Sequence, residues 1–250
     1  MSDAIQDTLE LKPLDEAHVT ILYDNRPGTP GLIHGWGFSC ILELRETVIL
    51  FDTGKSSTDL SRNMEALGFS VDDLDMVFLS HQHRDHTGGV SALAGRGLDV
   101  YVPSGFPKSL LEALTSMDFH VHELPTPKIL SGAAASTGTM GHVVGEHSLI
   151  VRVGDGLLLV TGCAHQGVLE AVDRAMRLTG LPVKTLLGGL HMFDMPPDRA
   201  LSVAEGLKTM GVERVVPCHC TGSRGVWALS RFYDLSNLVG HVGMRVRVSR

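Results

Sequence analysis

The sequence predicts an α/β protein in which two β-sheets pack face to face and helices cover their outer faces. Both halves of the chain open with β-rich sequence and continue as alternating strand and helix patterns, which is typical of a layered α/β fold. No long charged or Ser/Pro-rich linker separates the halves, and 250 residues are enough for one large core. We therefore expect a single domain over residues 1–250.

Each element follows from a local pattern. Short apolar runs bounded by Gly, Pro and polar residues predict strands. These are His18–Tyr23, Phe38–Leu44, Thr47–Phe51, Met76–Leu79, Val100–Val102, Phe119–His122, Ser148–Val153, Leu157–Thr161, Val183–Leu187, Arg214–Val216 and Met244–Val248. Apolar residues at helical spacing predict helices at 56–67, 107–115, 167–178 and 197–210, with Ser56 or Ser57 and Ser104 as N-caps of the first two. The first three strands should form a meander, and the turn at 154–156 a hairpin.

Composition excludes several classes of partner. The chain has 21 Lys+Arg against 28 Asp+Glu, a net charge of −7, and no basic run, which argues against binding to nucleic acid or to an anionic membrane. Met1–Asp24 lacks the pattern of a signal peptide, and no apolar run approaches the roughly eighteen residues of a membrane span. We expect a cytoplasmic protein that acts on a small molecule, either alone or as an oligomer.

The four cysteines are too few and too irregularly spaced for a disulfide framework, so we expect reduced thiols at Cys40, Cys163, Cys218 and Cys220. Cys218 and Cys220 are expected to be packed thiols on the face opposite the residue between them. Motifs for nucleotide phosphates, dinucleotides and a serine nucleophile are missing from the sequence. No organic cofactor is therefore implied.

The strongest chemical signal is a cluster of four potential metal ligands directly after the strand at 76–79: His81, His83, Asp85 and His86. In an extended segment, His-x-His directs two rings toward one ion, and imidazole and carboxylate suit Zn, Fe or Mn. Asp85 and His86 then face a neighbouring position. Two ions at that spacing activate a bridging hydroxide for attack on an ester, lactone or phosphate.

This cluster is the His-x-His-x-Asp-His signature of the metallo-β-lactamase superfamily, which the chain resembles over most of its length. The resemblance includes an Asp ahead of the signature, a Gly-His before the hairpin, a ligand after the next strand and a late His. It implies a four-layer αβ/βα sandwich with a dinuclear site at the edge of the two sheets. The motifs at 161–165, 188–191 and 217–222 resemble the branch named for dihydropterin and ribofuranosylaminobenzene-phosphate synthase.

The resemblance implies further ligands. His219 follows the strand at 214–216, where the family places its last metal ligand. Cys163 stands where the family places a bridging Asp, and its thiolate favours zinc. The third ligand of the first ion stays open between His142, which lies in a Gly-His-x-x-Gly pattern, and His165 or His191. His147, close to His142, is expected on the sheet surface.

Four residues are expected to support the ions or the substrate. His191 could be a metal ligand, a substrate-binding donor or a general acid. Asp52 resembles the family Asp that orients a metal-bound imidazole. His34 and Trp36 could border the pocket, with Trp36 as a flat wall for a ring-bearing substrate. Asp85 would anchor the second ion and orient the nucleophile.

These observations predict a metal-dependent hydrolase of the metallo-β-lactamase fold with two divalent ions. Zinc is favoured, with Mn or Fe as alternatives. The substrate would be a phosphoester, a cyclic phosphate or a lactone. One alternative is a pterin-pathway synthase or transferase that uses the same metal site. A second is a mononuclear iron enzyme with oxidative chemistry, and a non-catalytic metal-binding or sensing domain is a third.

Overall fold

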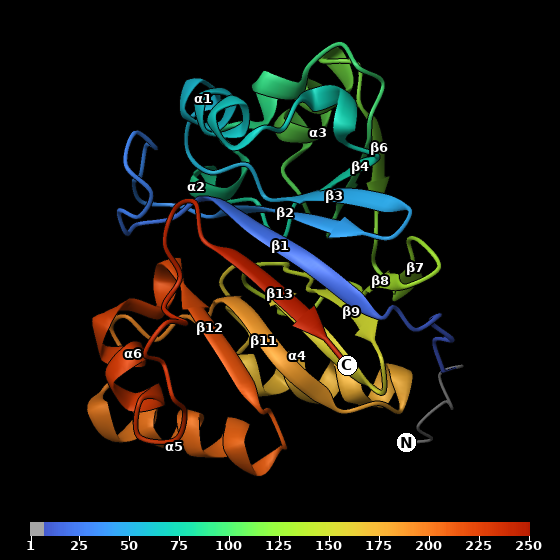
Figure 1. The fold of residues 1–250 in the computed structure, drawn as a ribbon. Helices are drawn as coiled ribbons and strands as arrows, with labels where there is room; N and C mark the ends of the chain where they lie inside the picture. Colours follow the sequence, from blue (N-terminus) through green and yellow to red (C-terminus); the bar gives the residue numbers. More distant parts are fainter. Residues whose placement is uncertain (1–7) are drawn as a thin grey trace.

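Two β-sheets pack face to face between two layers of helices, as expected for a four-layer αβ/βα sandwich (Figure 1). The structure is a computed structural model and describes residues 8–250; the first seven residues of the segment Met1–Asp24 lie outside the described part. In Figure 1 helices cover the outer face of the upper sheet and the outer face of the lower one. The predicted layering is confirmed.

The first sheet has seven strands in the order β13-β1-β2-β3-β4-β5-β6. The antiparallel pairing of β1 with β2 and of β2 with β3 confirms the predicted meander, and β3 to β6 then run parallel. The strands are β1 Glu16–Tyr23, β2 Ser39–Leu44, β3 Thr47–Phe51, β4 Met76–Phe78, β5 Asp99–Val102, β6 His120–Glu123 and β13 Arg245–Ser249.

The second sheet has six strands in the order β12-β11-β10-β9-β8-β7. β9 and β10 pair antiparallel around the tight turn at 154–155, which confirms the hairpin, whereas β10, β11 and β12 run parallel. The strands are β7 Lys128–Ile129, β8 Ala134–Ser136, β9 Leu149–Val153, β10 Gly156–Thr161, β11 Val183–Gly189 and β12 Arg214–Cys218.

Helices α1 and α3 cover the first sheet, and α4, α5 and α6 cover the second (Figure 1). Their bounds are α1 Ser57–Leu67, α3 Lys108–Ser116, α4 Val168–Thr179, α5 Pro197–Thr209 and α6 Gly222–Leu229. The short helix α2, Arg84–Thr87, and 3₁₀ turns at Val71–Asp73, Val90–Leu93 and His219–Thr221 lie in connections. Ser56 caps α1, as predicted, because its side chain accepts a hydrogen bond from the amide of Asp59.

Three details differ from the expectation. Ser104 does not cap α3: the N-cap is Pro107, and the Ser104 side chain and amide instead bind Oγ1 of Thr139. The short strands β7 and β8 were not predicted, because their few small or exposed residues carry no periodic signal. Helix α6 was missed because two glycines weaken its pattern; at Gly225 a Cβ would lie 2.7 Å from Cβ of Met192, so close packing requires the glycine there.

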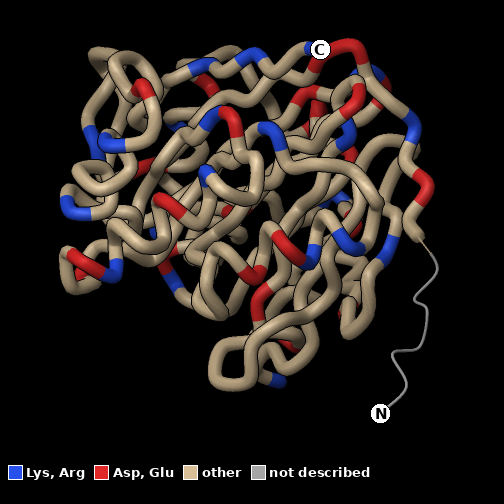
Figure 2. Tube along the Cα trace, turned by 90° about the horizontal axis from the view of Figure 1, so that it is seen from below, with Lys and Arg blue, Asp and Glu red and all other residues tan. Residues whose placement is uncertain are grey.

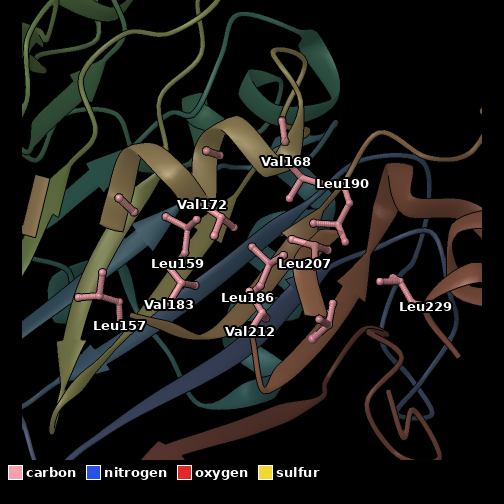
Figure 3. Close-up of a cluster of buried hydrophobic side chains, with 14 of the residues drawn as sticks. Leu157, Leu159, Val168, Val172, Val183, Leu186, Leu190, Leu207, Val212 and Leu229 are labelled. Atoms are coloured by element: carbon pink, nitrogen blue, oxygen red, sulfur yellow. The ribbon is translucent and has the colours of Figure 1, made fainter. Parts of the chain in front are cut away.

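Apolar side chains fill the space between all layers. Between the two sheets, Phe51 stacks on Phe78 with ring centroids 5.3 Å apart. Under the second sheet, side chains of α4 and of strands β10 and β11 point toward one another (Figure 3). The labelled residues there include Leu157, Leu159, Val168, Val172, Val183 and Leu186. This burial holds the strand ends in fixed positions, so that the loops that follow them meet reproducibly.

Charges of both signs are interspersed along the chain trace (Figure 2). Across residues 8–250, none of the helices combines the length and apolar character that a membrane crossing would require.

Candidate metal centre

The candidate metal ligands all follow strands of the two sheets. Asp52 follows β3, the segment 80–86 follows β4, the segment 163–165 follows β10, and His191 and His219 follow β11 and β12. Because the carboxyl ends of parallel strands meet at one edge of a sheet, these loops converge where the two sheets adjoin. The loops approach so closely that a Cβ on Gly162 would lie 2.0 Å from Oγ of Ser80. Only glycine fits there.

The first group of imidazoles comprises His81, His83 and His165. Their ring centroids are 4.7 Å apart for His81 with His83, 4.7 Å for His81 with His165 and 4.9 Å for His83 with His165. Nε2 of His81 lies 3.1 Å from Nδ1 of His83, so both nitrogens face the same point. Three imidazole nitrogens that converge in this way suit a transition-metal ion.

The second group comprises Asp85, His86 and His219. Oδ2 of Asp85 lies 3.8 Å from Nε2 of His86 and 3.3 Å from Nε2 of His219. The rings of His86 and His219 are 4.9 Å apart. Asp85 and His86 therefore lie beside each other and beside His219, while the ring of His86 is also 4.1 Å from that of His81, so the two groups adjoin.

Cys163 lies between the two groups. Its sulfur is within 4.8 Å of ligand atoms of His81 and His165 on one side and of His86 and His219 on the other. The distance from Sγ to Nε2 of His86 is 3.4 Å, and only 4% of the residue is exposed. A thiolate in this position can reach ions in both groups.

Buried partners hold the ring orientations. Oδ2 of Asp52 accepts a hydrogen bond from Nδ1 of His86 at 2.6 Å and from the hydroxyl of Ser80 at 2.7 Å. Because that hydroxyl donates to Asp52, it accepts from Nδ1 of His81 at 2.9 Å. Both rings therefore carry their proton on Nδ1 and present a lone pair on Nε2 toward the centre.

Glu146 fixes the orientation of the His165 ring. It was not identified from the sequence. Its carboxylate is fully buried and accepts hydrogen bonds from Nδ1 of His165 at 2.7 Å and from the backbone amides of Cys163, Ala164 and His165. Its only sequence signal is its position directly after the Gly-His-x-x-Gly pattern, which by itself does not single out a carboxylate. Glu146 thus positions two candidate ligands through a single carboxylate.

His219 is held by the loop after β1. Oδ1 of Asn25 lies 2.9 Å from its Nδ1, and Oδ2 of Asp24 accepts a hydrogen bond from its backbone amide at 2.7 Å. Neither residue was identified from the sequence, because 194 or 195 positions separate them from His219. Nε2 of His219 is left free to face Asp85.

The electrostatics favour cation binding. Burial lowers the pKa of His86 to about 3 and that of His81 well below its usual value, so both rings are neutral and able to donate lone pairs at pH 7. Burial opposes the ionisation of Asp85, but the hydrogen bond from His219 outweighs it and holds the pKa of Asp85 below its usual value. Neutral imidazoles, an ionised carboxylate and a thiol form a donor set that fits divalent ions such as zinc.

Two histidines lie elsewhere than expected. His142 is exposed on the loop before β9 and belongs to neither group, so the structure brings His165 rather than His142 to His81 and His83. His147 is not on the sheet surface. It is fully buried, stacks on Phe78 at 3.8 Å and binds the carbonyl of Leu79 through Nε2 at 3.0 Å.

An aromatic wall borders the centre on the side of His219. Trp36 is 48% exposed and lies edge-on to His219 with ring centroids 4.9 Å apart. Phe193, which was not identified from the sequence, lies 5.8 Å from Trp36 and 5.6 Å from His191. His34 is exposed and has no ring contact among the described residues.

His191 lies beside the first group, with its ring 4.6 Å from that of His165. Its φ of +50° is unusual for a residue other than glycine and marks a constrained position. Cys163, His191 and Cys220 form a further cluster whose ligand atoms are within 4.8 Å of one another. Cys218, by contrast, packs between the sheets as expected.

The pKa values of the two thiols of this cluster are shifted in opposite directions. Burial opposes the ionisation of both, and it raises the pKa of Cys163 well above its usual value. Hydrogen bonds from Cys163 and His191 nevertheless hold the pKa of Cys220 well below its usual value. Cys220 is buried, as expected of a packed thiol, and the turn after β12 brings its sulfur within 4.8 Å of ligand atoms of Cys163 and His191.

Known proteins resemble this chain in sequence. The family model of the anti-Pycsar protein Apyc1 matches residues 34–104. A curated protein of Methanocaldococcus jannaschii, 7,8-dihydropterin-6-methyl-4-(β-D-ribofuranosyl)-aminobenzene-5′-phosphate synthase, is 24% identical, with 74% of this chain and 81% of that protein covered.

Two solved structures share the fold. A metal-dependent hydrolase of the β-lactamase superfamily aligns with a TM-score of 0.77 and 24% identity, over 94% of this chain and all of the other. A diphosphatase from the PhnP family aligns with a TM-score of 0.61 and 15% identity, over 93% of this chain and 97% of the other. The chain therefore has the metallo-β-lactamase fold, and its predicted resemblance to that superfamily and to the dihydropterin and ribofuranosylaminobenzene-phosphate synthase branch is confirmed.

Proposed function

We propose that this protein is a dinuclear metal-dependent hydrolase that acts on a small phosphoester. One observation carries the proposal. Four imidazoles have Nδ1 fixed by a buried or half-buried partner, and their Nε2 atoms converge on two neighbouring points with Cys163 between them. Such an arrangement is expected of a preorganised metal centre and not of histidines in a core.

The proposed ligands divide into two sets. His81, His83 and His165 would hold the first ion; Asp85, His86 and His219 would hold the second, and Cys163 would bridge them. When bound, two such ions lower the pKa of water and stabilise the negative charge that develops on the substrate. Asp85, which is half-buried, would orient the attacking water by accepting its hydrogen bond.

Other residues of the chain would act on the substrate directly. His191, at the edge of the first group, would donate a proton to the leaving oxygen. Its pKa is raised by a hydrogen bond with Cys220, which increases the protonated fraction near neutral pH. Trp36 and Phe193 would bind the flat part of a substrate that carries a ring.

A phosphoester is favoured over a lactone by the similar proteins whose names state an activity. These include a synthase of a ribofuranosyl 5′-phosphate compound and a diphosphatase. The synthase name also keeps the pterin-pathway transferase as a second candidate. Formation of a new carbon–nitrogen or carbon–carbon bond, with release of phosphate from a pterin substrate, would identify that activity.

The decisive test combines metal content with hydrolysis. Protein purified without chelators is analysed by elemental mass spectrometry, next to His83→Ala and His219→Ala, with His142→Ala as the matched control. We expect about two zinc or manganese ions per chain in the wild type and the control, and about one in each of the other variants. Bis(p-nitrophenyl) phosphate should be cleaved only by the fully loaded proteins.

Other outcomes would reject the proposal. A single stoichiometric iron with no hydrolysis would indicate the oxidative alternative. A well-folded protein that holds no metal and cannot be reconstituted would rule out metal-dependent catalysis. Loss of an ion in His142→Ala but not in His83→Ala would contradict the ligand sets.

A further inference from the structure

Two buried thiols meet at the edge of the metal centre. The sulfurs of Cys163, after β10, and of Cys220, after β12, are within 4.8 Å of each other, and Sγ of Cys220 lies 3.7 Å from the carbonyl oxygen of Cys163. The missing side chain of Gly189 makes room for this contact, since a Cβ there would lie 2.6 Å from Sγ of Cys220. The proposed metal ligands do not include Cys220.

The other two cysteines are in a different environment. Cys40 and Cys218 pack among apolar side chains between the sheets, and the thiol of Cys218 donates to the carbonyl of Val216 at 3.4 Å. The Cys163–Cys220 pair instead lies next to His165 and His191, which line an open pocket of about 360 Å³. A small oxidant that enters this pocket reaches His191, whose ring nitrogen lies within 4.8 Å of both sulfurs.

We propose that Cys163 and Cys220 form a site of reversible oxidation by hydroperoxides, at which the two thiols close a disulfide. One thiolate attacks the O–O bond of the hydroperoxide and becomes a sulfenic acid, and the other oxygen leaves as water or an alcohol after it takes up a proton. The second thiol then attacks the sulfenic sulfur, a sulfur–sulfur bond forms and water leaves. Two electrons pass from the two sulfurs to the hydroperoxide.

The disulfide would also inactivate the metal centre. A disulfide sulfur has no negative charge and is a poor ligand, so both ions would lose the donor that lies between them. Bound ions should in turn protect Cys163, because its lone pairs are then engaged. This coupling depends on the proposed role of Cys163 as a metal ligand, whereas the disulfide itself depends only on the contact between the sulfurs.

The test is to treat the full-length protein with hydrogen peroxide, with and without added zinc, and to map disulfides after alkylation of free thiols. Trypsin places Cys163 in the peptide 153–174 and both Cys218 and Cys220 in the peptide 215–224. The same cross-linked peptides would therefore arise from either partner. Cys220→Ser and Cys218→Ser, a matched pair two positions apart, distinguish them.

We expect wild-type protein and Cys218→Ser to give the cross-link between these peptides, to lose it in dithiothreitol and to form it more slowly with zinc bound. Cys220→Ser should give no cross-link. Oxidised wild type should fail to take up zinc until it is reduced, a readout that needs no substrate. Since the wild-type measurement stands alone, a variant that folds poorly does not remove the test.

The proposal would be overturned by the absence of the cross-link in peroxide-treated wild type, or by its persistence in Cys220→Ser, which would assign it to Cys218. Oxidation of the two cysteines to separate sulfinic acids would also overturn it. Equal rates of cross-linking with and without zinc would overturn the coupling to the metal centre. None of these results depends on whether the protein hydrolyses phosphoesters.

Discussion

Nδ1 of His86 lies 2.6 Å from Oδ2 of Asp52, and neither side chain has any exposed surface. The same carboxylate binds the amide and the hydroxyl of Ser80, and through that hydroxyl it fixes His81. One buried carboxylate therefore sets the orientation of a ring in each of the two proposed metal sites. An imidazole whose Nδ1–H is bound to a carboxylate is also a stronger ligand through Nε2.

Asp52→Asn should weaken metal binding, because the amide removes the negative charge that makes His86 and His81 strong ligands. The expected loss is about 10- to 100-fold in affinity. Zinc affinity is measured by competition with a chromophoric chelator. Asp99→Asn is the matched control, since Oδ1 of Asp99 also lies 2.6 Å from a ring nitrogen, Nε2 of His122, but away from the centre. Equal affinities in the two variants would refute the positioning role of Asp52.

Glu146→Gln should destabilise the protein even without metal. The buried carboxylate accepts three backbone hydrogen bonds and one from His165, whereas the amide group of glutamine would turn a donor toward some of these donors. We expect the free energy of unfolding to fall by about 2 to 3 kcal/mol. Urea unfolding of the metal-free protein measures the change, with the exposed Glu123→Gln as control. A variant as stable as the wild type would show that the network is dispensable.

His147 should make the metal-free protein less stable in mild acid. Burial lowers its pKa from the ordinary 6.5 to about 3, so below pH 6.5 the unfolded chain binds a proton that the folded protein excludes. Stability is therefore unaffected above about pH 7 and falls as the pH decreases from about 6.5. At about pH 5 the exclusion of this proton lowers the free energy of unfolding by about 2 kcal/mol.

His147→Gln removes the imidazole that takes up a proton in the unfolded chain. Although the variant loses some stability at every pH, its loss between about pH 7.5 and pH 5 should be about 2 kcal/mol smaller than that of the wild type. Urea unfolding at the two pH values provides the measurement. His120→Gln, on the exposed face of β6, serves as the control and should keep the wild-type dependence. An unchanged dependence in His147→Gln would contradict the assignment.

Trp36→Ala should impair the binding of substrates that carry a ring. The loss of one aromatic contact corresponds to a rise in KM of about 2- to 12-fold for an aryl phosphodiester, with a smaller change for an alkyl diester of the same charge. Trp227→Ala is the control, because Trp227 is 40% exposed on α6 and its ring contacts Arg231 instead of the centre. Equal effects on aryl and alkyl substrates would exclude a ring-binding role for Trp36.

The sequence alone could predict those features that are local. The meander from β1 to β3 and the helix capped by Ser56 follow from periodicity and turn residues within a dozen positions. The proposed assignment of His81 and His83 to one ion and of Asp85 and His86 to the other likewise rests on spacing within six residues. In each case the physical cause lies within a short segment of chain.

The remaining features depend on contacts between distant segments. His142 and His165 were both plausible partners of His81, and only the packing of β10 against the loop after β4 brings His165 into range. Cys220 meets Cys163 across strand β11, although the alternation of side chains along an extended segment predicted it on the far side. The chain turns into a 3₁₀ helix at His219, and that turn changes the direction of the thiol.

Because His219 is held by Asp24 and Asn25, the second proposed metal site joins the first strand to the last part of the chain. During synthesis the donors of the first site, His81, His83 and His165, leave the ribosome before His219 does. A nascent chain can therefore assemble one ion site while the other still lacks a donor. A chain that ends after β11 contains the first proposed set of ligands but lacks His219, so the second proposed site requires the last part of the chain.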